Sequence, residues 1–165
     1  MAINFPEGTQ NFPSRITQVV QNHYDSASTH NGSSYTDTGL NVSITPRSTS
    51  SKVLVLATFI FGQSKSPTST QDNMKAFTLY RESTDLAPAH SQFFAHQNES
   101  YASINWDEQT QVASICYLDS PSTTSSINYK LRMKVDSTQT TIMFNRRGYG
   151  DHTGNSTITC IEVEA

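Results

Sequence analysis

The sequence contains few charged residues, only two cysteines and no long hydrophobic run. Asp, Glu, Lys and Arg make up 15% of the 165 residues, and the formal net charge is −3. A sequence pI near 5.9 offers no broad basic surface of the kind that binds nucleic acid. The longest nearly apolar run, residues 53–61, is too short to cross a bilayer. We therefore expect neither nucleic acid nor a membrane as a partner.

Patterns typical of catalysis or of a bound cofactor are also missing. The chain has no Gly-x-Ser-x-Gly, no P-loop, no His-Glu-x-x-His and no Cys-x-x-Cys. His90 and His96 would point the same way in an extended segment, but without a third ligand they are better explained as loop or packing residues. Asp119, before Ser120 and Pro121, is interpreted as a turn residue rather than a calcium ligand. We expect no enzymatic activity, no cofactor and no metal ion.

The two cysteines, Cys116 and Cys160, lie in segments that we predict to be strands. Neither has a Cys or His beside it at metal-binding spacing. Buried free thiols are the simpler interpretation, because cysteine is among the most buried residue types. A disulfide between neighbouring strands is the alternative that the sequence leaves open.

Hydroxyl groups supply most of the polarity of the chain. There are 23 Ser and 21 Thr residues. Low hydrophobicity with few aromatic residues would indicate disorder, but this chain has 16 Phe, Trp and Tyr residues and little net charge. Because β-branched Thr suits a pleated surface, the composition favours an all-β fold with Thr-rich outer faces. A chain of this length forms one domain with a single core.

The clearest structural signal is a strict alternation over residues 127–135. Apolar and polar side chains take turns, which is typical of an antiparallel strand with one buried face. The expected buried face contains Ile127, Tyr129, Leu131, Met133 and Val135. The expected outer face contains Asn128, Lys130, Arg132 and Lys134.

Further strands are predicted between short polar connections, and no segment has the period and caps of a helix. The region 82–109 has no clean period and fits either two irregular strands or a long excursion. Strands at this spacing favour an antiparallel β-sandwich or barrel. The predicted strands are residues 35–45, 52–61, 75–81, 112–118, 126–136, 139–145 and 156–163.

The first 22 residues differ from the rest and are predicted to form an extended N-terminal arm, with the sandwich domain covering residues 23–165. The residue before a proline is driven out of the helical region, and two Phe-Pro pairs occur here. We expect this arm to attach the protein to a neighbour. The candidate attachment residues are Phe5, Pro6, Phe12, Pro13 and Arg15.

Two of the predicted strands, 112–118 and 156–163, carry apolar residues on both faces. Strands of this kind are covered twice, once by the opposite sheet and once from outside. A second copy of the chain would provide the outer cover. The candidate subunit-interface residues are Tyr117, Ile158 and Cys160.

Aromatic residues among Asn, Gln and Ser provide a candidate ligand surface. Such side chains are suited to stacking and hydrogen bonding with sugars or with protein. The alternative is that they fill the core of the sandwich. The candidate residues are His96, Tyr101 and Trp106, close to Phe93 and Phe94.

Several motifs resemble virion structural proteins of tailed bacteriophages, especially of cyanophage and other marine-phage type. The resemblance covers residues 33–165. Its motifs are Asp-Thr-Gly-Leu-x-Val-x-Ile-Thr-Pro at 37–46, Ser-Thr-Ser-Ser-Lys-Val-Leu-Val at 48–55, Leu-Tyr-Arg-x-Ser-Thr-Asp-Leu at 79–86, Leu-Asp-Ser-Pro-Ser-Thr-Thr-Ser at 118–125 and Ser-Thr-Ile-Thr-x-Ile-Glu-Val at 156–163.

The resemblance implies a jelly-roll β-sandwich of the complement and tumour-necrosis-factor type that forms a homotrimer. Such proteins contact other capsid or tail proteins on the particle exterior. The implied location is the virion, assembled in the host cytoplasm. The implied role is capsid decoration or a short fibre, because no shaft segment precedes the domain. A tail-fibre protein that binds host surface polysaccharide is the alternative.

Overall fold

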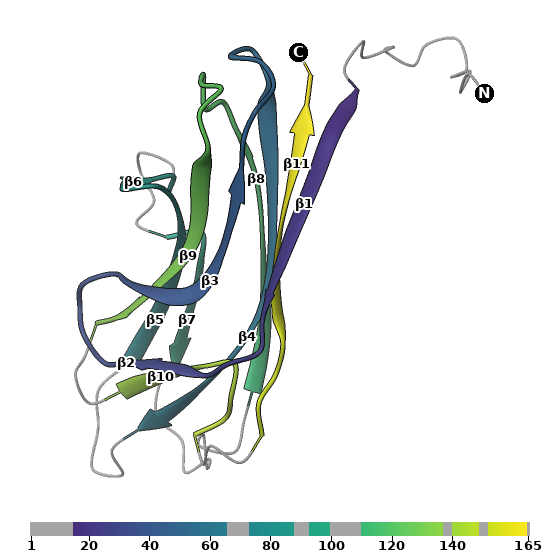
Figure 1. The fold of residues 1–165 in the computed structure, drawn as a ribbon. Helices are drawn as coiled ribbons and strands as arrows, with labels where there is room; N and C mark the ends of the chain where they lie inside the picture. The colour runs from purple at the N-terminus through teal and green to yellow at the C-terminus, as the bar shows by residue number, and fades with distance from the viewer. Residues whose placement is uncertain are drawn as a thin grey trace, which may run out of the picture.

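The structure is a computed structural model that describes residues 15–65, 73–87, 93–99, 110–136, 140–148 and 152–164. The described residues form β-strands and no helix (Figure 1). The strands are β1 (Ile16–Tyr24), β2 (Ser28–His30), β3 (Thr36–Ile44), β4 (Lys52–Lys65), β5 (Asn73–Arg81), β6 (Thr84–Asp85), β7 (Ala95–Glu99), β8 (Thr110–Asp119), β9 (Ile127–Val135), β10 (Thr140–Phe144) and β11 (Ser156–Val163).

The strands form two antiparallel sheets that pack face to face, so the prediction of an all-β sandwich is confirmed (Figure 1). In the first sheet, sheet A, the order is β1-β11-β4, and β8 pairs with the other edge of β4. β10 and β2 continue the same sheet beside the far end of β4. In the second sheet, sheet B, the order is β3-β9-β5, and β7 and β6 both pair with β5.

The core lies between the inner faces of the two sheets. All the residues predicted for the inner face of β9 are buried, which confirms the alternation. Phe77 of sheet B contacts both Phe59 and Phe61 of sheet A, with ring centroids 4.7 Å apart in each pair. Each large apolar side chain buried here contributes about 1.5–3 kcal/mol relative to its exposed state. The pleat therefore fixes which residues hold the sheets together.

The predicted domain boundary at residue 22 is wrong. Residues 16–24 form β1, which pairs with β11 from Ile16↔Val163 to Tyr24↔Ser156. Arg15 lies beside β11 as well, with its Nε 2.6 Å from a carboxylate oxygen of Glu164. Any arm is therefore confined to the residues before β1. Sequence alone did not indicate this strand because a register shift between Ile16 and Gln18 breaks its alternation.

A buried carboxylate joins β11 to two other segments of the same chain. Glu162 is fully buried and accepts hydrogen bonds from the backbone N–H of Arg47 (2.7 Å) and from the side-chain amide of Gln18 (3.0 Å). Burial acts to raise the pKa of Glu162, but these donors and the Ser51 hydroxyl outweigh it and hold the pKa below its usual value. The ionised carboxylate therefore connects β1, β11 and the segment before β4.

Candidate functional site

The outer face of sheet A has a row of apolar side chains across four of its strands. The strand registers place Val19, Ile161, Leu54 and Leu118 in one row over β1, β11, β4 and β8. Val19 is 56% exposed and Leu118 is 50% exposed, at the two edges of this row. Further apolar side chains on the same face are Ile16, Leu56, Ile60, Val112 and Val163.

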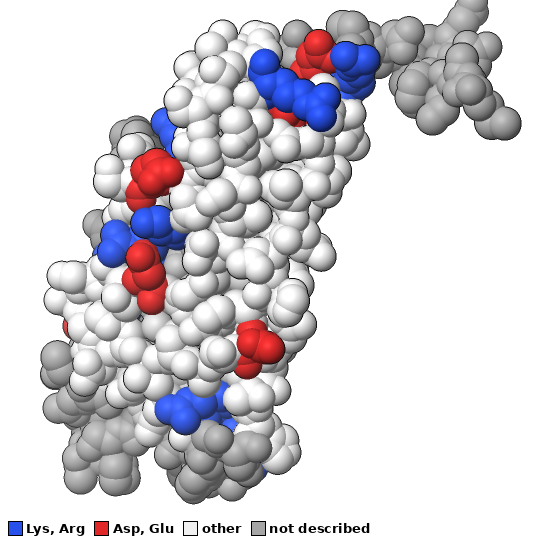
Figure 2. Space-filling view, in the orientation of Figure 1, with Lys and Arg blue, Asp and Glu red and all other residues white. Residues whose placement is uncertain are grey.

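This face contains almost no charge. Along the four strands, alternation directs Thr, Ser, Gln and apolar side chains outward, and Lys52 at one end is the charged member within the strands. In Figure 2 the right-hand side of the molecule, over β1 and β11, is correspondingly white between a charged upper rim and a few charges lower down. An apolar patch that spans several strands of a sheet is typical of a protein–protein contact.

The structure corrects the predicted subunit-interface residues. Ile158 and Cys160 are fully buried between the sheets, and Tyr117 is half-buried on the inner side, where its ring meets Phe94 at a centroid distance of 5.1 Å. These side chains contact the core of their own chain. The two-sided apolar character of β8 and β11 is nevertheless observed, because the outward residues of the same strands include Leu118 and Ile161.

The two cysteines lie on opposite sides of sheet A and are both free. Cys116 is exposed on the outer face opposite Leu56, whereas Cys160 points into the core opposite Val55. The interpretation of both as buried thiols is therefore wrong for Cys116. Burial, with a contribution from the charge of Asp119, raises the pKa of the Cys160 thiol to about 12.

The remaining predicted site residues lie in different places. Tyr101 and Trp106 fall outside the described residues, as do the attachment residues Phe5, Pro6, Phe12 and Pro13. His96 is in β7, where its backbone is opposite Ala76 of β5. Arg15, the fifth attachment residue, is exposed and pairs with Glu164. The structure thus brings none of these residues together into a described site.

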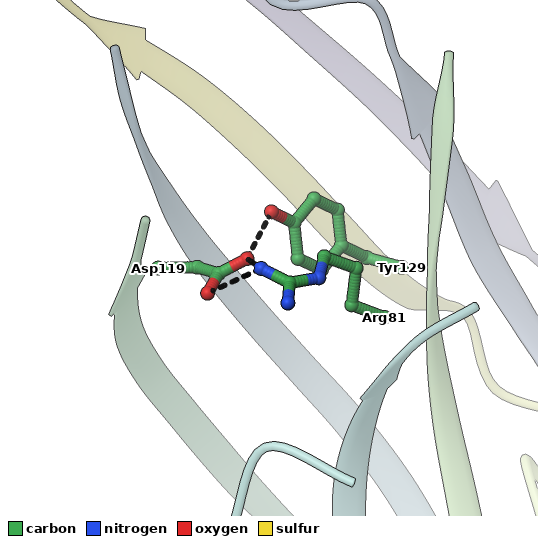
Figure 3. Close-up of polar contacts among 3 residues, drawn as sticks. All are labelled: Arg81, Asp119 and Tyr129. Carbon is green, nitrogen blue, oxygen red and sulfur yellow. Dashed lines mark hydrogen bonds and ion pairs between the residues drawn. The ribbon is translucent and has the colours of Figure 1, made fainter. Parts of the chain in front are cut away.

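A buried polar cluster connects the two sheets at one end of the sandwich (Figure 3). Asp119, the last residue of β8 in sheet A, accepts hydrogen bonds from Arg81 Nη1 at 3.0 and 2.8 Å and from the Tyr129 hydroxyl at 2.6 Å. Arg81 and Tyr129 belong to sheet B. Asp119 is 6% exposed, so this residue, which the sequence predicted only to form a turn, is also a buried acceptor between the sheets.

The chemistry of this cluster favours a structural role. Burial, followed by the hydrogen bond to Asp119, raises the pKa of Tyr129 above its usual value, so the phenol stays protonated and donates. The carboxylate is engaged by Arg81 and Tyr129 together, which leaves it poorly placed to accept a proton from a substrate. No group of three or more His, Cys, Asp or Glu residues within the described ranges is arranged to hold a metal ion. None of the described segments is a helix long and apolar enough to span a membrane.

Comparison with known proteins identifies no family for this chain. No protein-family model and no curated protein matches the chain. A solved structure described as "Structure of infectious bursal disease virus Gx strain" is similar at 12% sequence identity and a TM-score of 0.38. The match covers 99% of this chain and 44% of that chain, so this chain spans less than half the length of its neighbour. A likeness of this degree carries no argument about function.

Proposed function

We propose that the chain is a non-enzymatic structural protein of a tailed-bacteriophage particle, where it serves as capsid decoration or a short fibre. It assembles as a homotrimer, and the outer face of sheet A forms the contact between its copies. The observation that carries the proposal is the apolar surface that crosses β1, β11, β4 and β8 of this sheet. Identical copies of the chain can cover one another's apolar faces, so no other partner is needed for this contact.

Two further observations support this role. The chain crosses repeatedly between the two sheets, and β1-β11-β4-β8 faces β3-β9-β5-β7, which is the arrangement expected of a jelly roll. The sequence motifs of virion proteins fall on β3, β5, the β8–β9 connection and β11. Both are consistent with the trimeric jelly roll that the resemblance implies.

The energetics favour association through this face. Burying one exposed Val, Leu or Ile contributes about 1.5–3 kcal/mol, and five large apolar residues within the described ranges are at least 36% exposed. All five lie in β1, β4 or β8 of sheet A. Coverage of the face would remove several of them from water in each copy. Lys52, the first residue of β4, lies at the end of the face and does not interrupt it.

The oligomeric state tests the proposal directly. Sedimentation or light scattering of the purified chain is expected to give about three times the chain mass of 18.3 kDa at micromolar concentration. Leu118→Glu places a charge at the β8 edge of the apolar row and is expected to produce monomers, because an unpaired charge is costly to bury. Thr84→Glu, an exposed position in β6 of sheet B, is the matched control and should remain trimeric. A wild-type protein that is monomeric at every concentration would refute the assembly.

Attachment to the particle needs a separate experiment. A chain lacking residues 2–14 keeps β1 intact and is expected to fold and to form trimers, but to be absent from purified particles. Normal incorporation of the shortened chain would contradict attachment through this arm. The alternative role, a tail-fibre tip that binds host polysaccharide, predicts instead that the wild-type trimer binds host cells and blocks adsorption of the phage.

A further inference from the structure

The outer face of sheet B contains a hollow of about 360 Å³ where β3 and β9 separate. The pairing of these strands shifts between Asp37 and Asn41, and Gly39 between them has a φ of +98°. A side chain at Gly39 would meet the Tyr24 ring at 2.5 Å, so this position needs glycine. The hollow is lined by Asp37, Gly39, Leu40, Asn41, Glu82, Asn128 and Lys130.

The polar groups around the hollow are held by one another. The Asn128 side-chain amide donates to Asn41 Oδ1 (3.1 Å) and to Ser43 Oγ (2.9 Å), and the Asn41 amide donates to the Gly39 carbonyl (2.9 Å). Glu82 has a positive φ of 54°, and its Oε1 accepts the Asn128 backbone N–H at 2.6 Å. Side chains that are fixed before a ligand arrives lose little entropy when it binds.

Some polar groups at the hollow have no partner among the described residues. Asn128 Oδ1 is shielded from solvent and accepts no hydrogen bond there. No ion pair or hydrogen bond is found for the Lys130 ammonium group within the same ranges. Lys130 lines the hollow and is only partly buried, so its ammonium group is available to donate to a ligand.

The charges at the hollow balance. Asp37 is paired with Arg132 at 2.8 Å, and the guanidinium of Arg132 also lies 4.5 Å from the centre of the Tyr80 ring. Glu82 and Lys130 contribute one charge of each sign. Figure 2 shows acidic and basic side chains close together on the left-hand side of the molecule, in contrast to the white right-hand side. Neither a cation nor an anion is favoured by such a site.

We infer that this hollow binds a neutral sugar residue of a polysaccharide. Hydroxyl groups both donate and accept hydrogen bonds, so they match a wall of carboxylate, amide and ammonium groups without net charge. The volume lies at the lower end of the range for small-molecule sites and suits one or two sugar rings. The site lies on the opposite side of the sandwich from the proposed trimer contact. The inference therefore does not depend on the assembly of the particle.

The experiment is a titration of ¹⁵N-labelled full-length protein with glucose, galactose and mannose, with glucuronate and glucosamine as charged comparators. At least one neutral hexose is expected to shift the Asn41 and Asn128 side-chain amide signals and the backbone signals of residues 37–43 and 128–130, with a millimolar Kd. Lys130→Ala and Glu82→Gln are each expected to weaken binding about fivefold. Lys52→Ala, on the outer face of sheet A, is the matched control and should bind as the wild type does.

Three results would overturn the inference. The first is an absence of shifts with all three hexoses up to about 100 mM, where a site of millimolar Kd is filled. The second is a set of shifts that map to other strands, and the third is tighter binding of either charged sugar. The spectrum of each variant reports its fold, and Lys130→Met keeps the aliphatic stem if Lys130→Ala does not fold. The monomeric Leu118→Glu variant should bind sugar normally, which separates failure of this site from failure of the trimer.

Discussion

The Arg81–Asp119–Tyr129 cluster allows a quantitative prediction about what holds the sheets together. Tyr129→Phe keeps the buried ring and removes only the hydroxyl that donates to Asp119 at 2.6 Å. Hydrogen bonds to a charged group contribute about 1.5–3 kcal/mol, and Tyr129 is fully buried, so water cannot replace the donor. We expect Tyr129→Phe to lower the free energy of unfolding by about 2 kcal/mol.

Removal of the acceptor should cost more than removal of one donor. Asp119→Ala leaves the Tyr129 hydroxyl without a partner and the Arg81 guanidinium without its counter-charge. Breaking a buried ion pair from one side typically costs 3–5 kcal/mol. The Arg81 side chain is 25% exposed and regains some hydration, so we expect about 3–4 kcal/mol. In the Asp119→Ala background, Tyr129→Phe should then cost much less than 2 kcal/mol, because the two groups act on one interaction.

Urea unfolding followed by circular dichroism measures these differences. The variants are compared in the Leu118→Glu background at one chain concentration, so that unfolding is not coupled to association. Tyr80→Phe is the matched control, because Tyr80 lies on the outer face of sheet B and should lose less than about 0.5 kcal/mol. If Tyr129→Phe is as mild as this control, the phenol does not stabilise the cluster. If Asp119→Ala is equally mild, the whole account of the cluster is wrong.

Two further predictions concern single groups in sheet A. The pKa of Glu162 lies below its usual value, so its contribution to stability is present above about pH 5 and is lost as the pH falls through the folded-state pKa. Glu162→Gln should therefore destabilise the protein at pH 7. In thermal unfolding, the difference in stability between this variant and the wild type should shrink toward pH 3. Cys116 lies on the proposed trimer contact, so a maleimide should label it slowly in the wild type and quickly in Leu118→Glu, whereas buried Cys160 stays unlabelled in both. Equal labelling of Cys116 in the two proteins would argue against coverage of this face.

The strength of the alternation decided how much of the fold the sequence could predict. In β9 the polar and apolar residues separate cleanly, and the predicted inner face is the observed one. In β11 they do not: Glu162 is buried, while Ile161 and Val163 lie on the outer face. A pattern that is apolar on both sides cannot indicate which side is inside, which is why Ile158 and Cys160 were assigned to the wrong surface.

Long-range partners explain the other errors. Asp119 precedes Ser-Pro, and local turn chemistry alone favours an exposed residue there. Its actual environment depends on Arg81 in another sheet, 38 positions away in the chain. A signal was present, because Arg81 shares the parity of buried Phe77 and Leu79 in β5 and therefore points inward. When an arginine and an aspartate both fall on the inward-facing positions of their strands, they are candidates for a buried ion pair with each other.

The hollow on sheet B shows the same limit for a site. Its residues come from β3, β9 and the turn at Glu82, and nothing in their spacing places them together. The sequence did predict which residues of β9 face outward, and Asn128 and Lys130 are two of them. It could not predict the register shift in β3 that opens space beside them. Sites of this kind depend on strand register, which is fixed only when the whole sheet is paired.

The two outer faces of the sandwich have opposite chemistry, and this has a consequence for assembly. Stacked sheets lie about 10 Å apart, and successive side chains of a strand point to opposite sides. A copy bound to the apolar face of sheet A therefore leaves the polar face of sheet B directed away from that contact. In a closed trimer each copy would bury one face and present the other, so the particle would carry three sugar sites for every trimer.

Binding to an immobilised neutral polysaccharide should consequently be much tighter for the trimer than for Leu118→Glu, although both bind the free sugar equally. Equal binding of trimer and monomer to the immobilised polysaccharide would show that the three faces cannot engage one surface together.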